Sequence, residues 1–87
     1  MRTIFKYDLM IGYNSLNLPE RSKVIHVAEQ YGSLTIWVEQ PVVSHEPNRN
    51  YIFNVYGTGH FVTDNSAVHV GTALMSSGLV WHVYESK

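Results

Sequence analysis

Hydrophobic and polar residues alternate along several short segments of the chain, a pattern typical of antiparallel β-strands with one buried face. Gly, Asn, Ser, Asp and Pro residues separate these segments at short intervals. A sustained apolar period of the helical kind is lacking, and residues 19–23 are expected to form at most one helical turn. The pattern predicts extended segments at residues 2–9, 16–18, 23–30, 34–40, 51–56, 67–74 and 79–85.

The connections between these segments have the composition of turns and loops. Residues 31–33 (Tyr-Gly-Ser) and 75–78 (Met-Ser-Ser-Gly) predict two β-hairpins, in which glycine supplies the positive φ that such turns need. Residues 12–15 predict a turn after the first strand. Residues 41–50 contain two prolines and several turn-forming residues, and therefore predict a loop.

The length of the chain limits what these segments can build. The chain has 87 residues, and area scaling indicates that about 64% of the surface of the open chain is buried on folding. A doubly wound nucleotide-binding fold or a barrel enzyme does not fit in this length. We therefore predict a single all-β domain over residues 1–87, a small antiparallel β-sandwich or rolled sheet of about six strands with little or no helix.

Sorting each predicted strand by its period of two separates two faces. One face is aliphatic, with Leu34, Ile36, Val38, Tyr51, Phe53, Val55, Ile25, Val27, Val68, Val70, Leu79, Trp81 and Val83, and is the expected core. The other face collects His26, Trp37, Asn54, Tyr56, His69, His82 and Tyr84, with Gly71 beside His69. Three interpretations of this second face remain open: a second core layer, an interface between copies of the chain, or a ligand pocket.

Composition and charge narrow the function classes. The net charge is −1, only 15% of the residues are charged, and the six Lys and Arg residues are scattered, so no basic stripe is available for nucleic-acid phosphates. The absence of cysteine excludes a disulfide framework, a thiol nucleophile and a zinc site built on Cys. The sequence shows no signal-peptide pattern and no apolar run of membrane-spanning length, so the cytoplasm is the expected compartment.

The candidate chemistry lies in the histidines and in one glycine-rich stretch. The five histidines lack the close His-x-His spacing of zinc sites, and we expect neither a metal nor another cofactor. Residues 57–60 (Gly-Thr-Gly-His) end a predicted strand and match neither the Walker loop nor the Rossmann fingerprint. Their backbone N–H groups could cradle an anion, with His60 as a further donor, or the glycines could serve a tight turn alone.

The chain resembles a widespread family of small, largely uncharacterised proteins encoded by tailed bacteriophages and prophages. The similarity is carried by residues 3–7 (TIFKY), 18–19 (LP), 23–27 (KVIHV), 30–32 (QYG), 36–37 (IW), 57–60 (GTGH), 70–72 (VGT) and 78–85 (GLVWHVYE), while the 41–50 loop departs from the family pattern. This resemblance implies an accessory protein that works in the cytoplasm of the host bacterium. It brings no catalytic residues to this sequence.

Small phage accessory proteins often act against host defence, which suggests our main hypothesis. A homo-oligomer would sequester a nucleotide-derived immune signal, of the cyclic oligonucleotide or ADP-ribose type, without catalysis. Aromatic rings would stack on the base, and the 57–60 stretch and an arginine would hold the phosphate. The expected ligand-binding residues are Trp37, Arg49, Tyr56, Thr58, Gly59, His60, His82 and Tyr84, with Trp81 as a further stacking candidate on the core face.

Three alternatives to this hypothesis remain. An anti-CRISPR-type inhibitor would bind a host defence protein through one surface, although the near-neutral charge argues against a mimic of DNA. A phosphodiesterase would cleave the same signals with paired histidines. A virion or assembly protein would have a structural role in the particle. The sequence leaves the ligand, the defence system and the number of subunits open.

Overall fold

The chain folds into seven β-strands. The computed structural model describes residues 1–42, 45 and 47–86. The regular secondary structure in these ranges consists of β-strands, and they contain no helix long and apolar enough to cross a membrane. The strands are β1 (Arg2–Asp8), β2 (Gly12–Pro19), β3 (Lys23–Gln30), β4 (Ser33–Pro41), β5 (Asn48–Gly57), β6 (Val68–Leu74) and β7 (Val80–Ser86).

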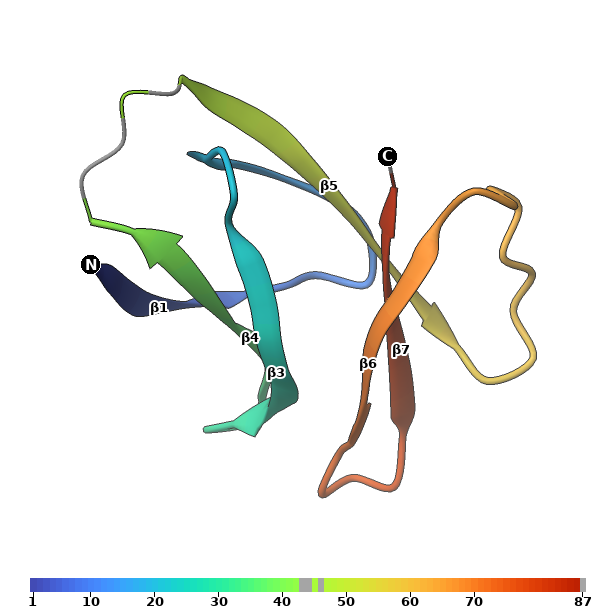
Figure 1. Cartoon of the computed structure of the whole chain (residues 1–87). Helices are drawn as coiled ribbons and strands as arrows, with labels where there is room; N and C mark the ends of the chain where they lie inside the picture. The colour runs from blue at the N-terminus through green and yellow to red at the C-terminus, as the bar shows by residue number, and fades with distance from the viewer. Residues whose placement is uncertain (43–44, 46, 87) are drawn as a thin grey trace.

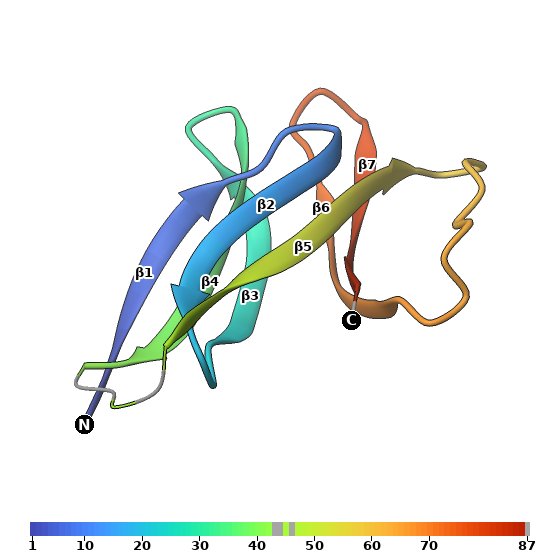
Figure 2. The same ribbon diagram turned by 90° about the horizontal axis from the view of Figure 1, so that it is seen from above.

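The strands form two antiparallel sheets that pack face to face (Figures 1 and 2). The three-stranded sheet has the order β1-β4-β3, and the four-stranded sheet has the order β2-β5-β7-β6. The chain changes sheet between β1 and β2, between β2 and β3, and between β4 and β5. The prediction of an all-β antiparallel fold is confirmed.

The second strand is longer than the sequence indicated, which raises the strand number to seven. Residues 12–15, predicted as a turn, instead pair with β5, from Gly12 opposite Val55 onward. The turn between β1 and β2 lies at residues 9–11, where the chain passes to the other sheet. The Gly-Tyr-Asn-Ser stretch has the composition of a turn, which is why the sequence predicted one. In the structure its backbone is paired with β5, and β2 forms an edge of the sheet.

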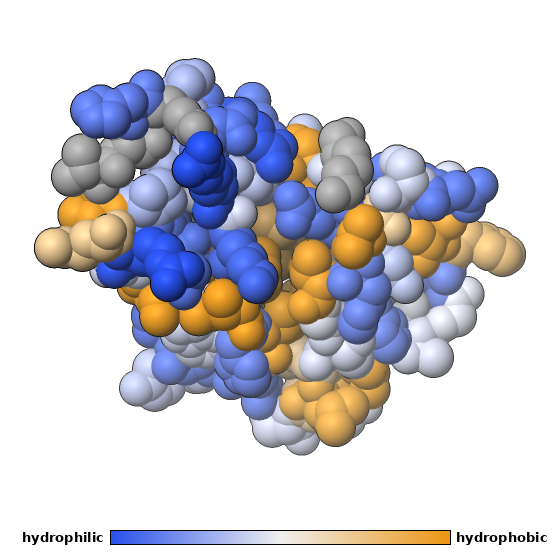
Figure 3. Space-filling view, in the orientation of Figure 1, coloured by the Kyte–Doolittle hydropathy of each residue, from blue (hydrophilic) through white to orange (hydrophobic). Residues whose placement is uncertain are grey.

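The core lies between the inner faces of the two sheets. Its most deeply buried side chains are Phe53, Ile36, Val38 and Val83, all with an exposed fraction below 2%. The predicted aliphatic face is thus confirmed along β4, along β5 and at the centre of β7. Apolar side chains also reach the surface between the two sheets, along the middle of the view in Figure 3.

Two β-bulges change the predicted faces of β3 and β6. In β3 the register shifts between Val24 and His26, so Val24 packs on the core and Ile25 is exposed. In β6 the register shifts between His69 and Gly71. A bulge adds one residue to its strand and reverses the sides of all residues beyond it. The predicted core position of Ile25 is therefore wrong, since its side chain is exposed. Val68 precedes the β6 bulge and shares the inner side of the sheet with Glu85 and Phe53, but it is exposed at the start of an edge strand, so its predicted core position is wrong for a different reason.

Both predicted hairpins are present. Gln30 pairs with Ser33 around a two-residue turn in which Tyr31 and Gly32 have φ of 51° and 82°. Positive φ at both central residues is the type I′ geometry, whose twist matches that of the flanking strands. The β6–β7 hairpin closes with the N–H of Gly78 donating to the carbonyl of Met75 at 2.9 Å.

The predicted loop at residues 41–50 is shorter than expected. β4 extends through Pro41 and β5 begins at Asn48, so both ends of this stretch belong to strands. Residues 43, 44 and 46 lie outside the described residues. Proline is tolerated at Pro41 because this residue is the last one of its strand.

Candidate functional site

The outer face of the four-stranded sheet carries two rows of polar and aromatic side chains. Residues directly opposite one another on neighbouring strands share a face, so the strand pairing defines the rows. The first row holds Asn54, Tyr84 and His69, and the second holds Tyr56, His82 and Thr72, each from β5, β7 and β6 in turn. The antiparallel register therefore gathers side chains from three strands.

The bulge in β6 brings two residues three positions apart onto this one face. In a regular strand, His69 and Thr72 would point to opposite sides of the sheet. Because Val70 is the extra residue of the bulge, His69 and Thr72 point to the same side of the sheet. The Nε2 atom of His69 lies 2.8 Å from the Oγ1 atom of Thr72. The same shift turns Gly71 toward the core, where sequence periodicity had placed it beside His69 on the outer face.

A chain of hydrogen bonds crosses the face. The Nε2 atom of His82 is bonded to the Oγ1 atom of Thr58 at 2.9 Å, and its Nδ1 atom is bonded to the Oγ1 atom of Thr72 at 3.0 Å. Thr72 in turn contacts His69. Both ring nitrogens of His82 are engaged, so its imidazole is held in a fixed orientation.

Aromatic rings stand beside this chain. The Tyr84 ring meets Tyr56 with centroids 5.8 Å apart and His69 with centroids 5.3 Å apart, both in edge-to-face geometry. Edge-to-face contacts of this kind stabilise a fixed arrangement of rings. Tyr56 and Tyr84 are half-buried, which leaves part of each ring open to the surface.

Residues 57–60 form a tight turn at the end of β5. The N–H of His60 donates to the carbonyl of Gly57 at 3.1 Å, and the N–H of Gly57 donates to the Nδ1 atom of His60 at 2.9 Å. Gly59 has φ of 90°, a conformation that favours glycine. The turn thus uses two of the four N–H groups that the sequence suggested for an anion. Because Nδ1 accepts the hydrogen bond from the N–H of Gly57, the neutral His60 ring carries its hydrogen on Nε2.

These groups surround a hollow of about 220 Å³ on the outer face of the four-stranded sheet. Six of the eight expected ligand-binding residues line it: Tyr56, Thr58, Gly59, His60, His82 and Tyr84, together with Gly57 and Val62. None of these lining residues is acidic. A second hollow of about 320 Å³ shares Gly57, Thr58 and His60 with the first and continues past the turn to Trp81.

Trp37 does not belong to this group. It lies on β4, opposite Lys6, and its ring faces His26 with centroids 5.4 Å apart. These residues occupy the outer face of the three-stranded sheet, which is the other side of the sandwich. The single aromatic and histidine face expected from the sequence is therefore two separate faces.

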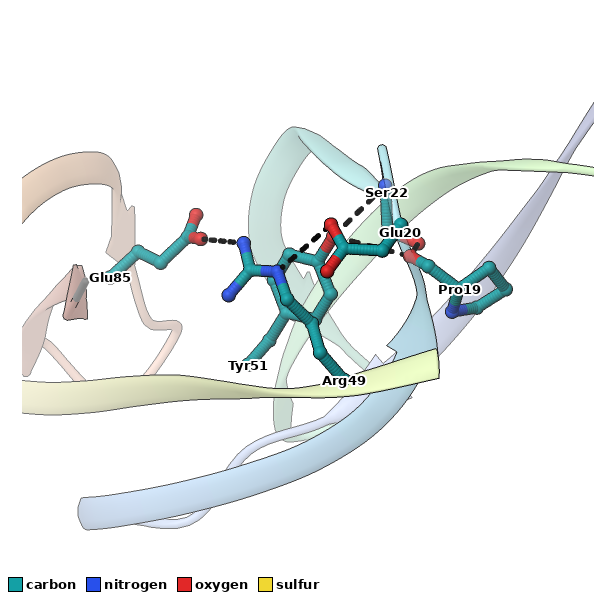
Figure 4. A network of polar contacts seen from close by, with 6 residues as sticks. All are labelled: Pro19, Glu20, Ser22, Arg49, Tyr51 and Glu85. Carbon is teal, nitrogen blue, oxygen red and sulfur yellow. Dashed lines mark hydrogen bonds and ion pairs between the residues drawn. The ribbon is translucent and has the colours of Figure 1, made fainter. Parts of the chain in front are cut away.

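Arg49 is also separate from the hollow, and its contacts lie near the start of β5 (Figure 4). Its guanidinium lies 3.7 Å from the ring centroid of Tyr51, 3.3 Å from Glu20 and 3.9 Å from Glu85. The hydroxyl of Tyr51 in turn accepts the N–H of Ser22 at 3.2 Å. The group links β5 and β7 to the turn between β2 and β3, one of the three points where the chain changes sheet.

Sequence reasoning missed Thr72 as a member of the site and left His69 outside the expected ligand set. Both depend on the β6 bulge, which the alternation of hydrophobic residues does not reveal. The signal that could have found the bulge is Gly71, because glycine inside a strand often marks a bulge or a close approach of another backbone.

The described ranges contain no group of three or more His, Asp or Glu side chains placed to hold a metal ion. Among their titratable groups, the carboxyl of Asp64, in the connection from the 57–60 turn to β6, has a lowered pKa. Hydrogen bonds from the side chain and the N–H of Ser66 favour its charged form.

A family model described as a domain of unknown function, DUF7352, matches residues 1–87. The chain belongs to this family. No curated protein and no solved structure matches the chain. In this DUF7352 protein, the outer face of the four-stranded sheet gathers the side chains whose chemistry points to a function.

Proposed function

We propose that this DUF7352 protein is a binding protein that sequesters a nucleotide-derived signal without altering it. The observation that carries the proposal is the hollow lined by six of the eight expected ligand-binding residues. We further propose, from the sequence resemblance to a phage family, that this activity serves phage counter-defence in the cytoplasm of the host bacterium.

The aromatic side of the hollow suits a planar ring. Tyr56 and Tyr84 are held edge to face, half-buried and partly open, so a base can stack on one ring without reordering the other. Stacking of a base on an aromatic side chain contributes about 1 to 3 kcal/mol. Because the two rings are already ordered, little conformational entropy is lost when a base arrives.

The polar side of the hollow suits an anion. In the neutral tautomer of His60, Nδ1 accepts the N–H of Gly57 and Nε2 carries the hydrogen, so the Nε2–H can donate to a ligand. Thr58 and Gly59 add their own backbone N–H groups at the same turn. The lack of acidic lining residues leaves a phosphate without a repelling neighbour.

The size of the hollow indicates how a nucleotide would lie. A volume of about 220 Å³ is below the range of roughly 300 to 1,000 Å³ typical of sites that enclose a whole drug-sized ligand. One base or one phosphate group fills it. A larger ligand would extend across the turn at residues 57–60 into the neighbouring hollow, which shares Gly57, Thr58 and His60.

His82 is held in place as part of the wall of the hollow. Both its ring nitrogens are bonded to threonine hydroxyls, at 2.9 Å and 3.0 Å, so the ring keeps one orientation before a ligand arrives. Sequestration depends on affinity alone. With ligand and protein both scarce, we expect a dissociation constant around nanomolar, about −12 kcal/mol.

Calorimetric titration with a panel of cyclic dinucleotides and cyclic ADP-ribose isomers tests the proposal. We expect one member to bind, His60→Ala and Tyr84→Ala to weaken its binding at least tenfold, and His26→Ala to leave it unchanged. His26 is a matched control because it is an exposed histidine on the other sheet. No heat and no change in melting temperature with any member contradicts the proposal. Ligand recovered intact after heat denaturation separates sequestration from hydrolysis.

A further inference from the structure

Two sheets have four edge strands, and these edges differ in how well they are protected from pairing with another chain. The edges at β3 and β6 each contain a bulge, and they lie against each other where Gly71 meets Val27. The edge at β2 ends at Pro19, and the side chain of Asn14 bonds to backbone groups of Met10 and Gly12. Each of these three edges therefore carries a protecting feature.

β1 is a regular edge by comparison. It pairs with β4 over seven consecutive residues, from Arg2 opposite Pro41 to Asp8 opposite Thr35, without a shift in register. It contains neither proline nor glycine. Figure 2 shows it along one side of the molecule, with β4 as its neighbour in the sheet. A strand with these properties can accept a further strand on its outer side.

The hydrogen bonds of β1 to β4 identify the backbone groups that face outward. The N–H of Leu9 donates to Leu34 at 2.9 Å, and the carbonyl of Met1 accepts the N–H of Val42 at 3.1 Å. In an antiparallel pair, bonded and non-bonded positions alternate, so the odd residues of β1 bond to β4. The N–H and C=O groups of the four even residues therefore point to the open edge: Arg2, Ile4, Lys6 and Asp8.

Two side chains of β1 favour a neighbour on this edge. Phe5 lies opposite Val38 and so on the inner face of its sheet, yet 53% of it is exposed, while Val38 is 1% exposed. A lysine in an edge strand usually discourages pairing. The Lys6 ammonium, however, bonds to Gln30 and lies 5.7 Å from the ring of Tyr31, so its charge is drawn across the sheet toward β3.

We propose that β1 pairs with β1 of a second copy of this chain, in antiparallel orientation, with the two-fold axis at Phe5. Residues whose numbers add to ten then face each other. Arg2 lies opposite Asp8 of the other copy, Ile4 lies opposite Lys6, and the two Phe5 rings meet at the centre. The two three-stranded sheets become one continuous six-stranded sheet.

The hydrogen-bond pattern and the charges select this register. The outward-facing even residues must pair with one another, which they do here, and Phe5 then occupies a non-bonded position where side chains approach most closely. A register centred on Ile4 would oppose Arg2 to Lys6, and one centred on Lys6 would oppose the two Lys6 residues. Like charges directly opposite one another are destabilising.

This pairing leaves the candidate site open in each copy. The hollow lies on the four-stranded sheet, whereas β1 belongs to the three-stranded sheet. A dimer formed in this way therefore presents two separate hollows, and its formation is independent of whether they bind a nucleotide.

The mass of the protein in solution, measured by light scattering against concentration, tests the proposal. We expect the native chain to dimerise and Ile4→Pro to be monomeric, because proline removes an outward N–H that β4 does not use. Ile4→Ala is the matched control: it keeps the N–H and should still dimerise. Far-ultraviolet circular dichroism checks that both variants are folded. A native chain that is monomeric at every concentration, or a dimer that survives Ile4→Pro, overturns the proposal.

A cysteine placed at the axis tests the register, since the native chain contains no cysteine. Two residues in a non-bonded antiparallel pair have Cα atoms about 4.5 Å apart, within the range that a disulfide spans. We expect Phe5→Cys to form a disulfide-linked dimer quickly under a mild oxidant. The control Ile25→Cys, on exposed β3 of the same sheet, should remain largely monomeric. Equal rates for the two variants would overturn the proposed register.

Discussion

Gly71 of β6 and Val27 of β3 are in direct contact between the two sheets. A Cβ atom placed on Gly71 would lie 2.4 Å from the Cγ2 atom and 2.7 Å from the Cβ atom of Val27, so the approach requires glycine. We expect Gly71→Ala to lower the free energy of unfolding by about 1 to 3 kcal/mol, because the added methyl overpacks the core. Urea denaturation at neutral pH measures the change.

A double-mutant cycle identifies the cause of this loss. Val27→Ala removes the Cγ2 atom nearest to the added Cβ but keeps the Cβ atom of Val27, so it relieves part of the overpacking, and the two substitutions together should cost about 1 kcal/mol less than the sum of the single changes. Additive effects would mean that the methyl groups of Val27 are not the cause of the loss.

Arg49 is expected to matter for stability and not for ligand binding. Its guanidinium stacks on Tyr51, but the side chain is 43% exposed, so the ion pairs with Glu20 and Glu85 are screened by solvent. We predict that Arg49→Gln lowers the free energy of unfolding by about 0.5 to 1 kcal/mol. Arg2→Gln, which breaks the more exposed pair with Glu39, is the control and should change stability less. An equal effect of both variants would argue against the stacking contribution.

The Thr72 hydroxyl is predicted to fix the hydrogen-bonded state of two histidines. Thr72→Val keeps the size and shape of the side chain but frees the Nδ1 atom of His82 and the Nε2 atom of His69. We expect a loss of about 1 kcal/mol or less in stability, because the site is exposed and water can replace the hydroxyl. Nitrogen chemical shifts of both imidazoles should change by NMR. Thr63→Val, at an exposed position outside the network, should leave them unchanged.

Asp64 is expected to titrate below its ordinary value of 3.8, because Ser66 donates two hydrogen bonds to the charged carboxyl. A lowered pKa in the folded state means that the group stabilises the fold above the unfolded-state pKa. This contribution is lost as the pH falls through the folded-state pKa, so the window lies below about pH 4. NMR titration of the carboxyl carbon measures the midpoint.

The control for Asp64 is Ser66→Ala, which removes the largest cause of the shift and should return the midpoint toward 3.8. An unchanged midpoint in this variant would show that the side chain of Ser66 is not what stabilises the charged form.

The sequence predicted the fold class and the inner face of the central strands because burial imposes a period of two on them. Ile36, Val38, Phe53 and Val83 follow that period and are almost fully buried. The prediction failed where one extra residue interrupts the period, as at the bulges of β3 and β6. A bulge is determined by contacts between strands, such as that of Gly71, and not by local alternation.

The candidate site was predictable in part for the same reason. Tyr56, His82 and Tyr84 lie on regular strands, so the period of two placed them on one face. The period of two also places Trp37 on the outer side of its strand, but that strand, β4, belongs to the other sheet. The assignment of strands to sheets depends on long-range pairing, which the alternation of residues does not encode.

The positions of the two tryptophans give each half of the sandwich its own fluorescent reporter. Trp37 lies on the outer face of the three-stranded sheet, whereas Trp81, on β7, packs against the core and lines two hollows at one end of the molecule. In Trp37→Phe and Trp81→Phe, the emission of the remaining indole follows one sheet at a time. Coincident unfolding curves would show that the two layers melt as one cooperative unit, as the single shared core implies.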